Sequence, residues 1–282
     1  MTSALEWNNS NLTTLQGCGE RYRRRVIERE PEPPTPSMIR GTVVHRVAKA
    51  ALRRKIGRGN DALPTDEEAR DLAATWFDGE WGKQEVRLVV GDDEDGATAM
   101  AQAKAETKDD AIHLAAYHLT AVASVVRPVA VERKIVVRPK DSDLTIHGTL
   151  DVVTEGETVT LEDIRDLKSG KKSPGRDMAD KSQQLTVYGL IRWAEKGQMV
   201  GALKLDHLYR TPANKTLKHV EQTTTRDAAD FAAVVARINT AVEAVKRGVF
   251  VPADPSSWWC SEKWCGYWTS CPYVRRTRRP TS

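Results

Sequence analysis

The chain has 282 residues, of which 40% are hydrophobic and 29% are charged, and its formal net charge is +4 at pH 7. This length is enough to bury one sizeable core, with room for a small appended subdomain. No apolar run reaches the roughly 18–20 residues that a membrane helix needs, and the first residues lack the apolar core of a signal peptide. We therefore expect a cytoplasmic protein that does not enter a membrane.

The positive charge gathers at the two ends of the chain. Residues 1–58 contain 12 Lys and Arg against five Asp and Glu, and residues 250–282 contain five against two, which leaves the segment between them acidic. Basic ends around an acidic centre suit a polyanion held near a metal-binding core. Ordinary solvated helix faces explain the same distribution, so charge alone does not decide.

The first predicted helix follows Trp7, where Asn and Ser side chains can cap it, and it leads to Cys18. A run of arginines comes next, and it includes Arg21, Arg23 and Arg24. One hypothesis is that they grip DNA phosphates, and the alternative is a solvated helix end. The proline-rich segment 31–36 predicts a stiff, non-helical connector.

Three further helices are predicted before the first strand. The first covers 37–55 and carries His45 on a face with apolar neighbours. The others cover about 64–81 and 107–126, and between them lies the acidic segment 91–96. We interpret that segment as a solvated turn, because its acids do not have the spacing of a calcium-binding loop.

Two β-prone runs, 146–153 and 161–170, each deliver an acid near a glycine. Alternate residues of a strand share a face, so Asp166 and Lys168 point the same way. Asp151 comes from the neighbouring run. Two carboxylates suit Mg²⁺, which keeps waters for a substrate, and a lysine can hold an attacking water. This pattern is compatible with phosphodiester chemistry, and the alternative is an Asp–Lys surface pair at the end of a strand.

The connection between these two runs sets a geometric condition. A tight hairpin about Glu155–Gly156 would place Asp151 opposite Thr160. Asp166 would then lie roughly 20 Å away, at about 3.3 Å per residue, which is too far to share an ion. We therefore expect the strands to splay, or to carry a longer loop or a bulge near Glu162–Asp163.

The strand that contains Lys168 is followed by a basic, glycine-containing loop with Lys171 and Lys172, which is well placed to touch a DNA backbone. A helix over 182–196 comes next, and it carries Gln184 and Tyr188 four residues apart on one face. The remaining predicted elements are a strand over 131–138, a half-buried strand over 203–210 and a helix over 226–247.

The chain has four cysteines, one near the start and three near the end: Cys18, Cys260, Cys265 and Cys271. Disulfides are not expected in a cytoplasmic chain of this size. Four thiolates brought together favour a tetrahedral zinc or a [4Fe–4S] cluster. Zinc sites normally show two short Cys-Cys pairs, whereas this chain has a split of one and three.

Four motifs in this order resemble those of RecB-like nucleases in the PD-(D/E)XK superfamily. They are G-x-x-x-H at 41–45, G-T-L-D at 148–151, D-L-K-S-G at 166–170 and Q-x-x-x-Y at 184–188. The resemblance implies an α/β fold with a restriction-endonuclease-like core, in which helices flank a mixed central sheet. It also implies a DNA substrate, either single strands or duplex ends.

The resemblance assigns roles to individual residues. It implies four ligands for Mg²⁺ or Mn²⁺: His45, Asp151, Asp166 and the backbone carbonyl of Leu167. Lys168 would orient the water or stabilise the charge on the phosphorane. Gln184 and Tyr188 would position the substrate strand or the lysine. Hydrolysis would leave a 5′-phosphate and a 3′-hydroxyl.

The cysteines extend the resemblance to RecB-like nucleases with an iron–sulfur cluster, including AddB and the CRISPR-associated four-cysteine exonucleases. Their entry segment is matched here by Ser10, Leu12, Cys18 and Tyr22. Their usual C-terminal spacing is C-x₂-C-x₅-C, and this chain departs from it with C-x₄-C-x₅-C. The implied [4Fe–4S] cluster would be structural, ligated by Cys18, Cys260, Cys265 and Cys271. Aromatic residues around the last three would shield it.

We therefore predict three segments: residues 1–30 as the first part of an iron–sulfur subdomain, 37–250 as the nuclease domain with a helical insertion, and 251–282 as the cysteine segment with a basic tail. The predicted function is a metal-dependent DNA exonuclease in the host cytoplasm, from a phage or another mobile element. A homo-oligomer and a recombination or CRISPR-adaptation partner are compatible with the sequence. The alternatives are a catalytically inactive DNA-binding or recombination-accessory protein, and a zinc protein without iron.

Overall fold

The computed structural model describes residues 5–91, 95–140, 144–156 and 161–274. Besides α-helices and strands, the described residues form four short helical turns, which are labelled η. Two of them, η1 and η3, are π-helical, and the other two, η2 and η4, are 3₁₀ turns. The elements in chain order are β1 (Leu5–Trp7), α1 (Asn9–Gly17), α2 (Gly19–Tyr22), η1 (Arg23–Ile27), α3 (Pro36–Lys55), η2 (Asn60–Ala62), α4 (Asp66–Gly82), α5 (Gly96–His118), η3 (Leu119–Ala123), β2 (Pro128–Val137), β3 (Leu144–Glu155), β4 (Glu162–Gly170), α6 (Gln183–Lys196), β5 (Leu203–Arg210), β6 (Leu217–Thr224), α7 (Ala228–Lys246) and η4 (Trp268–Ser270).

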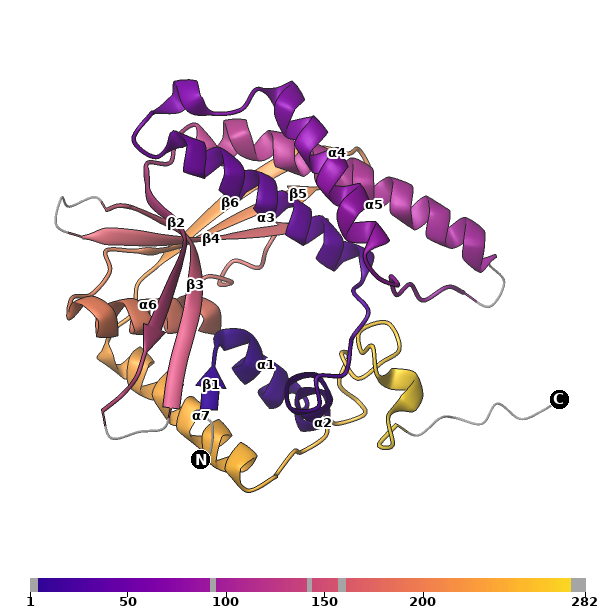
Figure 1. Ribbon diagram of the computed structural model, residues 1–282, viewed down its shortest axis with the longest axis vertical. Coiled ribbons are helices and arrows are strands. Elements are labelled where there is room, and N and C mark those ends of the chain that lie inside the picture. Colours follow the sequence, from indigo (N-terminus) through magenta and orange to yellow (C-terminus); the bar gives the residue numbers. More distant parts are fainter. Residues whose placement is uncertain (1–4, 92–94, 141–143, 157–160, 275–282) are drawn as a thin grey trace.

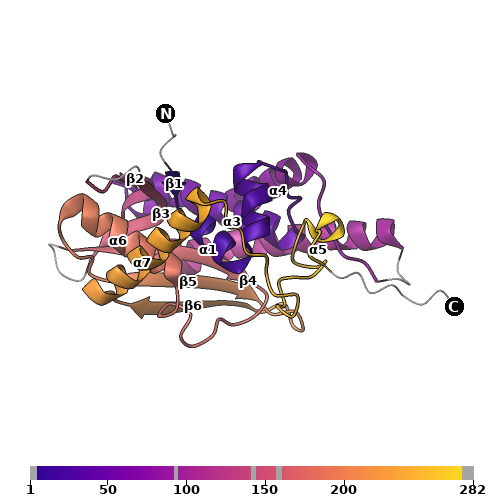
Figure 2. The same cartoon turned by 90° about the horizontal axis from the view of Figure 1, so that it is seen from below.

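Six strands form one mixed sheet in the order β1-β3-β4-β5-β6, and β2 pairs with the other edge of β3. The pairs β1–β3 and β4–β5 are parallel, and the other pairs are antiparallel. The long strand β3 lies at the centre of Figure 1. Figure 2 shows β5 and β6 running side by side along one edge of the molecule.

Helices cover both faces of this sheet. On one face, α3, α4 and α5 enclose a core that includes Val43, Phe77 and Leu114 (Figure 1). On the other face, α1, α6 and α7 pack on a second core that includes Leu185 and Phe231. The predicted α/β fold, with a mixed sheet flanked by helices, is confirmed. Within the described residues, no helix combines the length and the apolar character that crossing a membrane requires.

Four elements differ from the sequence-based prediction. Helix α5 already begins at Gly96, because Asp95 caps it by accepting a hydrogen bond from the Thr98 amide at 2.9 Å. Strand β5 is buried along almost its whole length rather than half-buried, since helices pack on it from both sides. Strands β1 and β6 were not predicted from the sequence; β1 has three residues, and β6 is an edge strand with polar side chains.

The register of β3 and β4 agrees with the longer loop among the three expected alternatives. Glu155 pairs with Glu162, and the Gly156 amide donates to the Leu161 carbonyl at 2.9 Å. The register therefore brings Asp151 opposite Asp166, one step beyond the last ladder pair, Val152 with Arg165. The predicted bulge near 162–163 is absent from this described part of the ladder.

The polar side of the first core contains one fully buried imidazole. His118 ends α5, and burial lowers its pKa to about 4. The folded state therefore keeps this ring neutral at pH values where the unfolded chain protonates it. The resulting stability is complete above the unfolded pKa of roughly 6.5 and is lost as the pH falls toward 4.

We expect the free energy of unfolding to fall by up to about 3 kcal/mol between pH 6.5 and pH 4 through His118 alone. The variant His118→Leu has no such group, so its stability should depend less on pH over this interval. Urea unfolding at a series of pH values measures both slopes. Equal slopes in the two proteins would contradict the assignment.

Candidate active site

The two acids of the predicted site meet where β3 and β4 diverge. The ladder between these strands stops at Val152 and Arg165. Just beyond that point, the Leu167 amide donates to Asp151 Oδ2 at 3.0 Å, so a side chain takes the place of the next ladder carbonyl. His45 approaches from α3, with Nδ1 3.4 Å from the same Asp151 oxygen.

A chain of polar contacts continues from Asp166 to α6. Lys168 Nζ lies 2.6 Å from Asp166 Oδ2 and donates to Gln184 Oε1 at 2.8 Å. Gln184 Nε2 donates to Asp166 Oδ1 at 2.8 Å and is 2.6 Å from the hydroxyl of Tyr188. The structure thus brings together Asp166, Lys168, Gln184 and Tyr188, as the helix spacing of the last two requires.

Burial and mutual repulsion shape the electrostatics of this group. Burial and the Asp166 carboxylate raise the pKa of Asp151 to about 6, against the lowering effect of His45. Burial and the same carboxylates raise the pKa of the Tyr188 hydroxyl, which therefore stays protonated. Two buried acids that repel one another are favourable neighbours for a cation.

Divalent metal ions fit the donor set at this point. Asp166 Oδ2 is buried and makes no hydrogen bond, although the Lys168 ammonium touches it. Mg²⁺ takes one or two carboxylates and fills its remaining positions with water or carbonyl oxygens. The structure does not bring three His, Cys, Asp or Glu side chains of the described residues into one group that could hold a metal ion.

Several supporting residues lie around the site that sequence reasoning did not assign to it. Lys49 on α3 lies 3.2 Å from Glu132 on the edge strand β2, so the two side chains form an ion pair beside the site. The buried Arg40 donates to the Ser169 carbonyl at 3.4 Å, just after Lys168. Arg40 stands directly before the G-x-x-x-H motif, and this position was its only signal in the sequence.

A buried ion pair lies in the adjacent strands. Arg165 donates to both carboxylate oxygens of Asp206 at 2.7 and 2.8 Å, and His219 is 2.8 Å from Asp206. The pKa of Asp206 is lowered by His219 and Arg165 despite its burial. These contacts join β4, β5 and β6 beneath the site and fix the strand that carries Asp166.

The basic residues predicted to contact DNA fall into two groups. The arginines of the first group already have acidic partners: Arg21 pairs with Glu32, Arg23 with Glu20 and Glu28, and Arg24 with Glu30. Arg24 is also buried, so its guanidinium faces protein rather than solvent. In the second group, Lys171 and Lys172 lie exposed in the loop after β4.

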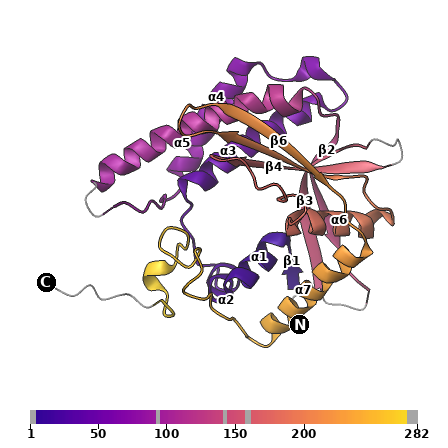
Figure 3. The ribbon, with the colours of Figure 1, turned by 180° about the vertical axis from the view of Figure 1, so that it is seen from behind.

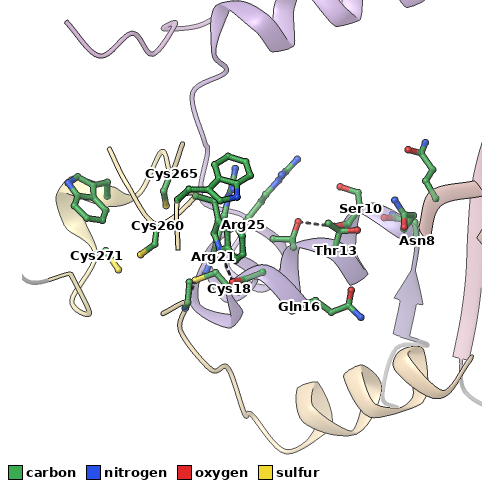
Figure 4. Close-up of a pocket in the computed structure, with 18 of the residues that line it drawn as sticks. Asn8, Ser10, Thr13, Gln16, Cys18, Arg21, Arg25, Cys260, Cys265 and Cys271 are labelled. Atoms are coloured by element: carbon green, nitrogen blue, oxygen red, sulfur yellow. Dashed lines mark hydrogen bonds between the residues drawn. The ribbon is translucent and has the colours of Figure 1, made fainter. Parts of the chain in front are cut away.

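One cavity of about 880 Å³ joins the site to the cysteines. Gln184 and Tyr188 line it at one end, and all four cysteines line it at the other. Figure 4 shows Cys18 on the N-terminal helices and the other cysteines on the C-terminal segment. Burial raises the pKa of the Cys260 thiol, and the other three cysteines raise it further.

Hydrogen bonds and a cation–π contact hold the two chain ends together. Cys18 Sγ accepts hydrogen bonds from the Arg21 and Ala253 amides at 3.4 and 3.3 Å, which are contacts suited to a thiolate. The Gly266 amide donates to Glu32 at 3.1 Å, and the guanidinium of Arg24 stacks 4.4 Å from the ring centre of Tyr267. The C-terminal segment therefore lies beside α2 in Figures 1 and 3.

The aromatic residues of this segment do not all act as the predicted shield. Tyr267 is buried, whereas Trp258 is 65% exposed and packs edge to face on Trp259 and Trp264. Trp258, Trp259 and Trp268 line the cavity. Shielding by the exposed tryptophans is thus partial, and their faces remain open to other contacts.

The family model of the PD-(D/E)XK nuclease superfamily matches residues 6–272, and the chain belongs to this superfamily. No curated protein matches.

Two solved structures are similar at a low level. The protein SSO0001 has 18% sequence identity and a TM-score of 0.36, with 62% of this chain and 77% of that chain covered. A candidate exonuclease from Eubacterium rectale has 11% identity and a TM-score of 0.36, with 75% of this chain and 85% of that chain covered. At these TM-scores neither likeness carries weight for function.

The closest backbone approach between the chain ends is at Gly19. Its amide donates to the Val251 carbonyl at 2.7 Å, and a Cβ there would lie 2.5 Å from backbone atoms of Phe250 and Val251. Gly17 has no atom within 4 Å of the corresponding position.

We expect Gly19→Ala to lower the free energy of unfolding by about 1–3 kcal/mol, because a methyl group would force two backbone segments apart. The matched control Gly17→Ala should leave stability within about 0.5 kcal/mol of the wild-type value. Chemical denaturation measures both. Equal stability of the two variants would contradict the close approach of the two ends.

Proposed function

We propose that the chain is a metal-dependent DNA exonuclease that hydrolyses phosphodiester bonds. Members of the superfamily to which it belongs are typically metal-dependent nucleases. The observation that carries the proposal is the meeting of Asp151, Asp166 and Lys168 at the point where β3 and β4 separate. His45 and the Leu167 carbonyl are the further metal ligands that we propose.

A divalent ion held by Asp151 and Asp166 would polarise the scissile phosphate and lower the pKa of a bound water. The remaining chemistry belongs to the side chains. The Leu167 amide keeps the Asp151 carboxylate turned toward Asp166, because it donates to one of its oxygens at 3.0 Å.

Lys168 is held from two sides, by Asp166 and by the carbonyl oxygen of Gln184. An ammonium fixed in this way can orient the attacking water or stabilise the negative charge that develops on the phosphate. Gln184 in turn is oriented by the protonated hydroxyl of Tyr188. Gln184 and Tyr188 also line the large cavity, so they are the residues we propose to contact the substrate strand.

We expect Asp166→Asn and Lys168→Met each to lower the cleavage rate of 5′-labelled single-stranded DNA in Mn²⁺ by roughly 100-fold to 1000-fold, since each loses a charge needed in the transition state. Labels at the 5′ and at the 3′ end, followed over time, measure both the rate and the polarity of digestion.

Two exposed residues provide matched controls. Asp177 and Lys181 pair with each other on the surface, so Asp177→Asn and Lys181→Met remove the same charges away from the site and should cleave at the wild-type rate. Undiminished cleavage by Asp166→Asn and Lys168→Met would reject this site. Binding of DNA without cleavage by the wild type would favour the inactive, DNA-binding alternative.

We further propose a structural [4Fe–4S] cluster in a subdomain made from residues 1–30 and 251–282. Support comes from the four cysteines that line one cavity and from the backbone amides that donate to Cys18 Sγ. Thiolates near one another and hydrogen bonds to sulfur are features of such sites. The biological setting, in a phage, another mobile element or CRISPR adaptation, stays a sequence-based prediction.

We expect protein purified without oxygen to contain about four irons per chain and to absorb broadly near roughly 400 nm. Cys265→Ser should lower both, whereas Ser261→Ala, in the same turn, should change neither. Metal analysis and an absorbance spectrum make the measurement. One zinc per chain in place of iron would contradict the cluster and favour the zinc alternative.

A further inference from the structure

A second, much smaller cavity lies against the proposed metal ligands. Its volume is about 20 Å³, and its polar lining includes His45, Asp151, His118 and Glu132. A cavity needs about 10–15 Å³ of such volume to hold one water molecule, and the water needs two to four polar partners. The space therefore has room for one water and not for a larger ligand.

One buried nitrogen that borders this cavity has no partner. His118 is 1% exposed, and its Nδ1 makes no hydrogen bond within the described structure. The other polar groups around the cavity are engaged: Asp206 by Arg165, and Glu132 by Lys49. A buried imidazole nitrogen without a partner is costly, and an ordered water is the usual remedy.

The backbone on two sides of the cavity departs from regular geometry. Directly after His118, α5 changes to the π-helical turn η3, in which the Ser124 amide donates to the Leu119 carbonyl at 2.9 Å. Glu132 has a positive φ of 54° and lies between Val131 and Arg133, whose partners in β3 are the two neighbours of Asp151. Distortions of both kinds concentrate at functional sites.

We propose that one water molecule in this cavity hydrogen-bonds to His118 Nδ1 and to the Asp151 carboxylate, and that His118 is thereby a positioning residue for the metal ligands Asp151 and His45. Both residues line the cavity, so a water inside it can contact both. The Leu167 amide then holds the Asp151 carboxylate on one side, and the water bound to His118 holds it on the other. This inference rests on the proposed function, because it assigns metal binding to Asp151.

The variants His118→Leu and His118→Asn separate hydrogen bonding from packing. Leucine fills space and offers no polar atom, whereas the asparagine amide can occupy the place of Nδ1. We expect His118→Leu to weaken Mn²⁺ binding by roughly tenfold, as loss of a group that orients a ligand does, and His118→Asn to retain most of the affinity. Titration calorimetry on metal-free protein without DNA measures the affinity, and circular dichroism verifies folding.

A crystal structure of the wild type provides a second measurement that does not depend on the variants. It should show density for one water within hydrogen-bond distance of His118 Nδ1. An empty cavity, unchanged Mn²⁺ affinity in His118→Leu, or equal losses in the leucine and asparagine variants would each overturn the inference. Wild-type protein that binds Mn²⁺ but cleaves no DNA would instead remove the proposed function and leave the comparison of the variants intact.

Discussion

The hydrogen bond from the Leu167 amide to Asp151 is the contact on which the rest of the site depends. Two antiparallel strands that continued their ladder would tie up the backbone groups between them. Here the ladder of β3 and β4 ends at Val152 and Arg165, and a carboxylate takes over the next amide. The strands can then separate while Asp151 and Asp166 remain neighbours. The β3–β4 loop, which spans more residues than a tight turn, sets the register that makes this arrangement possible.

The separation of β3 and β4 also leaves part of β3 open to the large cavity, which residues from both chain ends help to line. Along this edge of β3, β1 pairs only with residues 144–146 and β4 only with 152–155. The stretch between them lines the large cavity, which extends to the four cysteines. Contacts such as Gly266 with Glu32 hold the two ends together across more than 200 residues of sequence. The space that we propose for substrate contact is therefore also lined by the two chain ends.

Residue spacing predicted much of this arrangement and missed the part that depends on tertiary contacts. The interval between Gln184 and Tyr188 is one helical turn, so their shared face follows from sequence alone. The requirement that Asp151 reach Asp166 predicted splayed strands, a bulge or a longer loop, and the register of β3 and β4 agrees with the longer loop. The burial of Arg24 could not be predicted in this way, since its partners include Tyr267, far away in the chain. His118 gave no signal either, because its proposed role depends on a cavity lined by residues from α3, α5, η3 and four strands of the sheet.

The central claim is that Asp151 and Asp166 bind one divalent ion between them. The most direct measurement is an anomalous-difference map from a crystal of the wild-type protein soaked in Mn²⁺. The account predicts one peak within about 2.2 Å of a carboxylate oxygen of each acid, which is a normal distance for a small divalent ion. A peak bound to only one of the two acids, or none near either, would contradict it.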